Sequence, residues 1–407
     1  MRDHRLTRRS LLCSAVGAAL LPRSVWAAEG QTLSNGVLVM PDGSTVSGGV
    51  SWKGSKITAL GPDVTGGTDL GGRWIVPGFT DAGCRLGLLE VGLESSTHDT
   101  SAKESIALDA RVIDGYNPRS DLIPVARVNG ITQAIITPDL SGMVPGHAAL
   151  VRTDRHLMND VVIEESVGLC MNLGRAGQGH EGPKSRIALM KAWRKFFEEH
   201  PKPKGKTKKD EETKIDKRIG MDLRRGELLA LIQANRADDI ERALALIEDN
   251  DLNAVLVGCV EGHLVADSIA AAGVPVLLGP LDAQPSSFQH PHARYENPAI
   301  LHEKGVKFAF RSGDAHAVRN LPTLAGLAVA HGLPWDAAIR ALTVNPMDIF
   351  GHPELGRLQE GAEATFFVVD GDPLQPRHPV QDVYIGGLAS SMETRQTRLY
   401  EQYRELR

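Results

Sequence analysis

The sequence contains little cysteine, few aromatic residues and no long apolar run. Four cysteines in 407 residues cannot form a disulfide scaffold for a chain of this length. Aromatic residues make up 5%, which argues against a stacking surface for single-stranded nucleic acid, and the formal net charge of −5 offers no basic surface for a duplex. A run of about 20 apolar residues, as a membrane span requires, is missing. We therefore expect neither binding to nucleic acid nor stable insertion into a membrane.

The remaining composition is that of an ordinary globular protein. Apolar residues make up 42% and charged residues 23% of the chain, which excludes a disordered or fibrous protein. The length permits two or three domains, or one large barrel with an appended domain.

Residues 1–28 have the features of an export signal. Four arginines at their start precede a short apolar stretch, and small residues ending at Ala27 or Ala28 provide a cleavage pattern. The paired Arg8 and Arg9 are typical of a bacterial twin-arginine signal. An amphipathic helix of the mature domain is the alternative, but charge, apolar run and cleavage site occur in the order of a signal. We therefore expect an exported, periplasmic protein.

Removal of this segment leaves Cys84, Cys170 and Cys259. An odd number of cysteines leaves at least one without an intramolecular partner. We interpret all three as small buried apolar residues, which is the common state of free cysteine. Catalysis by Cys84 or Cys259 is the alternative, but no Cys-His-Asn signature accompanies them.

Both ends of the remaining chain have a pattern typical of β-structure. Residues 29–75 alternate short apolar runs with glycine-containing turns, and residues 355–395 repeat this pattern. Together they predict a small β-sandwich-like domain formed by the N- and C-terminal segments.

The intervening residues 76–354 alternate apolar strands with helical patterns. The strand candidates lie at 74–78, 131–137, 148–152, 167–172, 228–234, 254–257, 275–278 and 307–310. Helices are expected from Asp238 onward and over 264–272, 321–331 and 335–342. This alternation favours the α/β class and a (β/α)8 TIM-type barrel, whose site lies at the C-terminal ends of its strands. A doubly wound sheet is the alternative, but no glycine-rich phosphate loop follows the first strand.

One segment differs from the rest in charge. Residues 191–225 contain 13 Lys and Arg against 7 Asp and Glu. Such an insertion could form an electrostatic lid over an anionic substrate. We prefer a solvated loop between barrel elements, because runs of like charge usually stay in solvent.

A series of short motifs resembles a known family. They lie at 76–81, 236–240, 274–280, 313–316, 341–346 and 361–366. In this order they resemble the amidohydrolase superfamily, and imidazolonepropionase-type members in particular. The resemblance implies a hydrolase of non-peptide carbon–nitrogen bonds that uses a divalent metal such as zinc.

The positions at which this resemblance would place the metal ligands hold other residues. The first barrel strand of the family ends in Asp-x-His-x-His, whereas residues 81–85 read Asp-Ala-Gly-Cys-Arg. Family histidines close the fifth and sixth strands, where this chain has Gln-Ala-Asn-Arg at 233–236 and Gly-Cys-Val-Glu at 258–261. The eighth-strand aspartate, which contacts metal and takes a proton from water in the family, is retained as Asp314. A catalytic divalent ion needs about three protein ligands, so we expect no metal cofactor.

Polar residues after the predicted strands could form a different site. The candidate catalytic residues are Asp314, His316, Glu261 and Arg85. His316 could orient Asp314 or share a proton with it, or both could belong to a helix-capping cluster. Arg85 could fill the space of the lost metal and pair with Asp314, or it could lie on the surface.

Further residues are candidates for binding a ligand. They are Asn235, Arg236, His263 and Arg319. Arginines near the former metal pocket could bind a carboxylate, because a guanidinium pairs with it through two hydrogen bonds. His290 and His292 could form an unfamiliar metal site with Asp314, but we favour loop histidines without a ligand role.

Two functions remain open at this stage. The resemblance favours a hydrolase of non-peptide carbon–nitrogen bonds, whereas the residue chemistry favours a non-catalytic barrel that binds a small anionic molecule or a partner protein. A homodimer is possible, but no interface is recognisable in the sequence.

Overall fold

The computed structural model describes residues 30–178, 182–203, 215–281 and 290–404. The predicted export signal at 1–28 lies outside these residues, as does most of the lysine-rich run at 202–209. Within the described chain, every helix is too short or too polar to cross a membrane.

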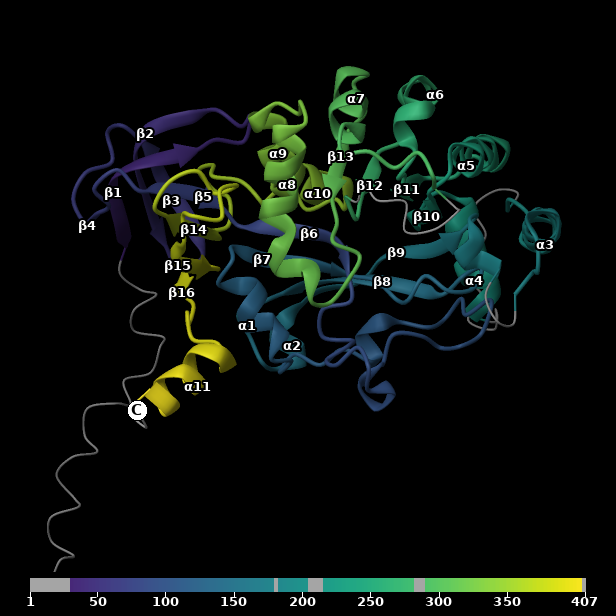
Figure 1. Ribbon diagram of the computed structural model, residues 1–407, viewed down its shortest axis with the longest axis horizontal. Coiled ribbons are helices and arrows are strands. Elements are labelled where there is room, and N and C mark those ends of the chain that lie inside the picture. Colours follow the sequence, from purple (N-terminus) through teal and green to yellow (C-terminus); the bar gives the residue numbers. More distant parts are fainter. Residues whose placement is uncertain (1–29, 179–181, 204–214, 282–289, 405–407) are drawn as a thin grey trace, which may run out of the picture.

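The two ends of the chain build one sheet, which lies at one end of the molecule (Figure 1). Its strands are β1 (Gln31–Val39), β2 (Thr45–Lys53), β3 (Lys56–Gly61), β4 (Thr68–Asp69), β5 (Trp74–Pro77), β14 (Phe366–Val369), β15 (Val380–Ile385) and β16 (Leu388–Ala389). They follow the order β16-β15-β14-β5-β1-β2-β3, and β4 pairs with β1. The antiparallel pair of β5 and β14 joins the two terminal segments, which confirms the predicted β unit made from both ends.

A second sheet of eight strands forms the nearly closed barrel. Its strands are β6 (Phe79–Cys84), β7 (Ile131–Ile136), β8 (Gly146–Arg152), β9 (Val162–Asn172), β10 (Ala230–Ala234), β11 (Ala254–Gly258), β12 (Val276–Leu278) and β13 (Phe308–Phe310). The backbone N–H of Gly313 donates to the carbonyl oxygen of Gly83 at 2.9 Å, which joins the two open edges of the sheet just beyond β13. The predicted α/β barrel is thus confirmed.

Two details of the predicted strands are wrong. Residues 74–77 form β5 of the terminal sheet rather than a barrel strand, and the chain changes sheets at Gly78. Strand β8 runs antiparallel to both β7 and β9, and the connection from β7 to β8 contains no helix. Residues 137–145 are too few for a parallel crossover, which takes about a dozen residues or more.

Helices cover the outer side of the parallel part of the barrel (Figure 1). The α-helices of the described chain are α1 (Leu122–Arg127), α2 (Met158–Val161), α3 (Arg186–Glu199), α4 (Ile215–Arg224), α5 (Ala237–Asn250), α6 (Ala266–Ala272), α7 (Asn297–Glu303), α8 (Leu321–Ala330), α9 (Trp335–Leu342), α10 (Val344–Ile349) and α11 (Arg395–Arg404). Short 3-10 helices are η1 (Ser95–Thr97), η2 (Val112–Asp114), η3 (Arg175–Gln178), η4 (Gly262–Leu264) and η5 (Ala317–Asn320). Helices α5, α6, α8 and α9 correspond to the four predicted ones, and α6 ends at Gly273 with φ +65° as its sequence suggests.

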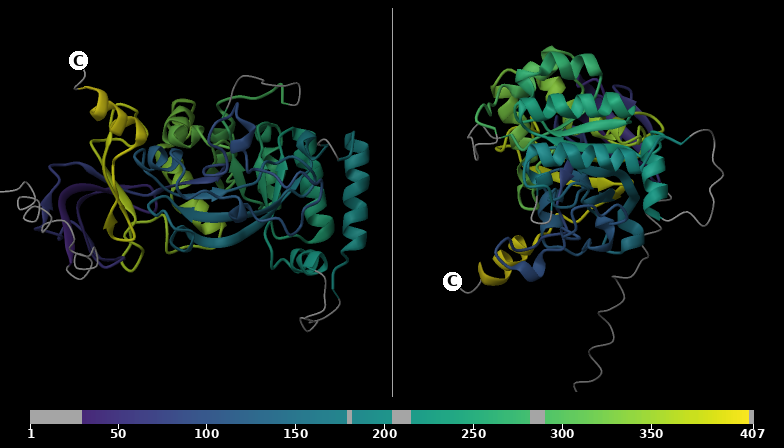
Figure 2. Two further views of the ribbon diagram at one scale, coloured as in Figure 1. Left: turned by 90° about the horizontal axis from the view of Figure 1, so that it is seen from below. Right: turned by 90° about the vertical axis from the view of Figure 1, so that its right-hand side faces the viewer.

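The described parts of the charged segment 191–225 are mostly helical, and not the solvated loop that its charge suggested; residues 204–214 lie outside the described residues. Residues 191–199 lie in α3 and residues 215–224 in α4, at the end of the molecule opposite the terminal sheet (Figure 2). One face of α3 buries Leu189, Trp193, Phe196 and Phe197, at helical spacing. The indole N–H of Trp193 donates to the backbone oxygen of Asn172 at 3.0 Å, so α3 is fixed to the end of β9. Apolar periodicity therefore outweighs the run of charge here.

Below its mouth the interior of the barrel is apolar, and it is closed at the N-terminal ends of the strands. Alternate residues of the strands, among them Ala82, Leu231 and Ala309, form one buried cluster with Met347 and Phe350 from α10 and the turn after it. Asn345 donates to the backbone oxygen of Phe308 at the start of β13, which places α10 at the N-terminal ends of the strands. The opposite, C-terminal ends form the mouth.

An ion pair ties the barrel to the terminal sheet. Arg152, at the end of β8, donates two hydrogen bonds of 2.7 and 2.6 Å to the carboxylate of Glu363, which lies just before β14. The two side chains are 22% and 13% exposed. Burial alone would raise the pKa of Glu363, but the bond and the charge of Arg152 overcome this effect and lower it. The pair is therefore well formed and largely shielded from solvent.

We predict that Glu363→Ala lowers the free energy of unfolding by about 2–3 kcal/mol, because it leaves a mostly buried guanidinium without its carboxylate. Urea unfolding followed by circular dichroism measures this change. Glu393→Ala is the matched control, since Glu393 pairs with Arg398 where both side chains are about 60% exposed, and such surface pairs contribute about 0–1 kcal/mol. Equal effects of the two substitutions would contradict the prediction.

Candidate functional site

The mouth of the barrel collects residues that directly follow its strands. Every second side chain of β13 faces the barrel interior. Ala309 is one of them, and Arg311, two residues later, follows on the same side. In β10 the same alternation leads from Leu231 to Gln233, and in β9 from Cys170 to Asn172. The layer nearest the mouth is thus polar, although the layers beneath it are apolar.

Arg311 is the central residue of this layer, and it was not among the residues predicted from the sequence. It is 5% exposed. Its Nε donates to the backbone oxygen of Gly83 at 3.3 Å. A Cβ atom added to Gly83 would lie 2.8 Å from that Nε, closer than real Cβ atoms approach other heavy atoms. Arg311 therefore fills the space that any side chain at position 83 would need. The alternation from Ala309 is the sequence signal that points to it.

Asp81 links the two strands that meet at this point. It is fully buried in β6, and its carboxylate accepts hydrogen bonds from the backbone N–H of Gly83 at 3.0 Å and of Ser312 at 3.1 Å. Burial raises the pKa of Asp81 from its ordinary value of 3.8 to about 6, against the opposing effect of these hydrogen bonds and of the nearby Arg311. Asp81 therefore supplies part of the negative charge near the buried guanidinium, without forming a salt bridge with it in the described chain.

Arg85 and Asp314 lie together, as the sequence suggested. Arg85 Nη2 is 3.6 Å from Asp314 Oδ2 and donates to the backbone oxygen of Gly313 at 3.3 Å. Asp314 Oδ1 accepts from the backbone N–H of His316 at 2.6 Å and of Ala317 at 3.1 Å. The geometry is that of the helix-capping alternative, since His316 contributes its backbone rather than its ring. The Asp314 side chain is 44% exposed.

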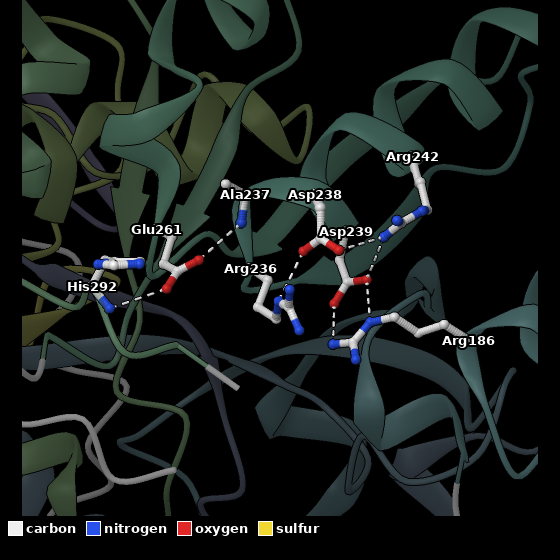
Figure 3. A network of polar contacts seen from close by, with 8 residues as sticks. All are labelled: Arg186, Arg236, Ala237, Asp238, Asp239, Arg242, Glu261 and His292. Atoms are coloured by element: carbon white, nitrogen blue, oxygen red, sulfur yellow. Dashed lines mark hydrogen bonds and ion pairs between the residues drawn. The ribbon is translucent and has the colours of Figure 1, made fainter. Parts of the chain in front are cut away.

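Glu261 belongs to a second polar cluster, at the start of α5 (Figure 3). It is 3% exposed, and its two oxygens accept from the backbone N–H groups of Ala237 and His292, each at 3.1 Å. Arg236 Nε lies 2.8 Å from Asp238 Oδ1, so its guanidinium is already paired. Glu261 thus holds the start of α5 and the segment at 292 in place.

The other predicted ligand-binding residues are distributed between these clusters and the surface. The backbone N–H of His263 donates to Asn297 Oδ1 at 2.8 Å, and burial together with the charge of Arg294 lowers the pKa of its ring. Asn235 has a buried Oδ1 without a hydrogen-bond partner in the described chain. Arg319 is exposed on η5 and contacts none of the other predicted site residues in the described part of the chain.

The three cysteines are free and buried, as expected from the sequence. Burial raises the pKa of the Cys170 thiol to about 12, and it also raises the pKa of Cys84 and of Cys259. A thiol must ionise to act as a nucleophile, so the structure gives no support to catalysis by cysteine.

Comparisons with known proteins agree with this architecture. A model of the amidohydrolase family matches residues 250–396. The structure is similar to that of an amidohydrolase from Thermotoga maritima MSB8, with a TM-score of 0.80 and 23% identity over 88% of this chain and 98% of that chain. The chain has the amidohydrolase fold. No curated protein matches it.

Two further structures with this fold are more distant. One is a prolidase in complex with N-methylphosphonate-L-proline, with a TM-score of 0.59 and 15% identity over 90% of this chain and 100% of that chain. The other is a molinate hydrolase, with a TM-score of 0.55 and 15% identity over 90% of this chain and 95% of that chain. At these identities the likeness establishes the fold alone.

The residues of this amidohydrolase fold do not fit the divalent metal that the sequence resemblance implies. Position 83 is where that resemblance places a metal-binding histidine, and the Arg311 side chain fills this space. A guanidinium has no lone pair for a cation, and its charge repels one. In the described chain no three His, Cys, Asp or Glu side chains lie together as metal ligands, so the His290, His292 and Asp314 combination is not formed there.

We predict that Gly83→Ala destabilises the protein by about 1–3 kcal/mol, because the new methyl group must displace the buried Arg311. Arg311→Ala opens that space, so the cost of the two changes together should be smaller than the sum of the single costs by about 1 kcal/mol or more. A double-mutant cycle of urea unfolding measures this coupling. Gly92→Ala is the control, since a Cβ there meets nothing within 4 Å. Additive costs would show that Arg311 does not occupy the space beside Gly83.

The raised pKa of Asp81 predicts how stability depends on pH. Because the folded pKa of about 6 exceeds the ordinary 3.8, the protonated carboxyl contributes stability that is fully present below 3.8 and is lost as the pH rises through about 6. Relative to Asp81→Asn, the wild type should lose about 3 kcal/mol of unfolding free energy across this range. Urea unfolding at several pH values tests this prediction, with the exposed Asp63→Asn as control. Parallel curves for wild type and Asp81→Asn would refute it.

Proposed function

We propose that this chain is a degenerate member of the amidohydrolase superfamily that binds a small anionic molecule at its barrel mouth, without metal-dependent hydrolysis. The observation that carries the proposal is the buried Arg311 guanidinium in the space beside Gly83. The family match over residues 250–396 and the ordered sequence motifs support membership of the superfamily.

A buried guanidinium favours an anionic partner. A charge removed from water is costly unless other groups compensate it. In the described chain Arg311 forms no salt bridge, while Arg85 is paired with Asp314 and Arg236 with Asp238. A carboxylate placed on Arg311 would add to the partial compensation that Asp81 provides, through hydrogen bonds of matching geometry.

Hydrolysis of a non-peptide carbon–nitrogen bond is the second candidate. Neighbours in fold include a prolidase and a molinate hydrolase, and sequence motifs resemble the imidazolonepropionase branch. In this alternative, Asp314 would act as the base toward water without a metal, with Arg85 holding its carboxylate. The hydrogen bonds from His316 and Ala317 already use one of its oxygens, which favours the binding function.

The predicted export signal at residues 1–28 supports a periplasmic location in this proposal. The ligand would be a small molecule of that compartment. A homodimer is compatible with this function and is not required by it.

We expect protein purified from the periplasm to contain far less than about one zinc, manganese or nickel ion per chain, since a catalytic site normally needs about three protein ligands. Elemental analysis measures this content. Added zinc should leave the thermal midpoint unchanged. The variant that combines Gly83→His, Arg85→His and Arg311→Ala removes the blocking guanidinium and should gain zinc affinity, unlike the same two histidine substitutions with Arg311 retained.

The hydrolase alternative has its own test. Cyclic amides, N-acyl amino acids and dipeptides should show no turnover above that of Asp314→Asn. About one metal ion per chain, together with turnover that Asp314→Asn abolishes, would overturn the binding function in favour of the hydrolase.

A further inference from the structure

Two buried oxygen atoms without partners lie on the same layer of the barrel as Arg311. They are Asn172 Oδ1 on β9 and Gln233 Oε1 on β10, and neither accepts a hydrogen bond in the described chain. The two residues are direct neighbours in the parallel pairing of these strands. Each continues the interior alternation, from Cys170 and from Leu231 respectively. Both oxygens therefore belong to one patch of the barrel wall at the mouth.

The orientation of the Asn172 amide is fixed by its surroundings. Its Nδ2 donates to the backbone oxygens of Leu140 at 2.5 Å and of Gly142 at 2.9 Å. Exchanging its oxygen and nitrogen would set the oxygen against two carbonyl oxygens, so the unpartnered atom is the acceptor. Asn172 is also completely buried. A buried acceptor without a donor is costly, and a ligand N–H group would satisfy it.

Arg311 reaches the same region from the opposite side of the barrel. It follows β13, contacts Gly83 at the end of β6, and its charge acts on Cys170, one interior position below Asn172. The mouth therefore offers a cation at one side and two neutral acceptors at the other. The cation suits a carboxylate, and the acceptors suit an ammonium group or other N–H donor.

We infer that the ligand is a small α-amino acid, a zwitterion whose carboxylate binds Arg311 and whose ammonium group donates to Asn172 and Gln233. This inference rests on the proposed anion-binding function and adds the requirement for a second, donating group. A simple carboxylate would satisfy Arg311 and leave both amide oxygens without a partner. A simple amine would add no negative charge to the partial compensation that Asp81 gives the guanidinium.

The test uses the protein without its predicted signal, residues 1–28. The standard L-amino acids are titrated into it one at a time, and binding is measured by isothermal titration calorimetry. The best-binding amino acid is then compared with the carboxylic acid that lacks its amino group and with the amine that lacks its carboxyl group. We expect each truncated compound to bind at least about tenfold more weakly than the amino acid.

Variants separate the two ends of the ligand. Gln233→Met removes one acceptor at similar side-chain volume. It should lower the affinity for the amino acid about tenfold and leave the affinity for the truncated carboxylic acid unchanged. Arg311→Met should abolish binding of both compounds. Arg398→Met, on α11 and 62% exposed, is the control and should change neither affinity. Circular dichroism and the thermal midpoint verify that each variant is folded.

The outcomes distinguish this inference from the function on which it rests. If the truncated carboxylic acid binds as tightly as the amino acid and still depends on Arg311, the zwitterion inference is wrong and the anion-binding function stands. If no standard amino acid binds, the inference is overturned as well. Stoichiometric metal with Asp314-dependent turnover would instead overturn the proposed function itself.

Discussion

The close approach of Arg311 to Gly83 is the constraint on which the mouth of this barrel depends. The guanidinium can lie there because residue 83 has no side chain. A Cβ at position 83 would lie 2.8 Å from Arg311 Nε, so a side chain there would force Arg311 to move. The carbonyl oxygen of Gly83 accepts from Arg311 and also from the backbone N–H of Gly313. One position thus joins β6 to the end of β13, closes the barrel and determines which chemistry its mouth can carry.

Asp81 makes the same junction sensitive to charge. Its carboxylate accepts from the backbone on both sides of the closure, at Gly83 and at Ser312. Burial raises its pKa to about 6 while Arg311 opposes that rise. Ionised Asp81 is costly because it is a buried charge, but its negative charge reduces the cost of burying the Arg311 guanidinium. In the proposed binding function a ligand anion on Arg311 would share that second role, and its binding would be coupled to the protonation of Asp81 through one guanidinium.

The fold was largely predictable from the sequence, whereas the centre of the site was not. Apolar alternation and the ordered motifs predicted the barrel and the terminal sheet. The antiparallel direction of β8 was missed, because the short connection at 137–145 has no strong sequence pattern that indicates it. The motif positions drew attention to Arg85, which does pair with Asp314. Arg311 lies outside every motif, and its importance depends on a contact with Gly83 that is distant in sequence. Helix α3 was not predicted either, because the charge of its segment drew the interpretation toward a loop although one face of the helix is apolar and buried.

A fixed guanidinium and a bound metal are not equivalent cations in the mouth of a barrel. A divalent metal activates water by lowering its pKa, and it needs an open coordination position to do so. A guanidinium cannot coordinate water in that way, but it orients a planar anion through two parallel hydrogen bonds. In the proposed binding function, Arg311 would therefore keep a positive charge at the centre of the mouth without the metal's means of activating water. In the amino-acid site that we infer, the neighbouring amide oxygens of Asn172 and Gln233 would add selectivity, because the ligand must satisfy a second group at the same time.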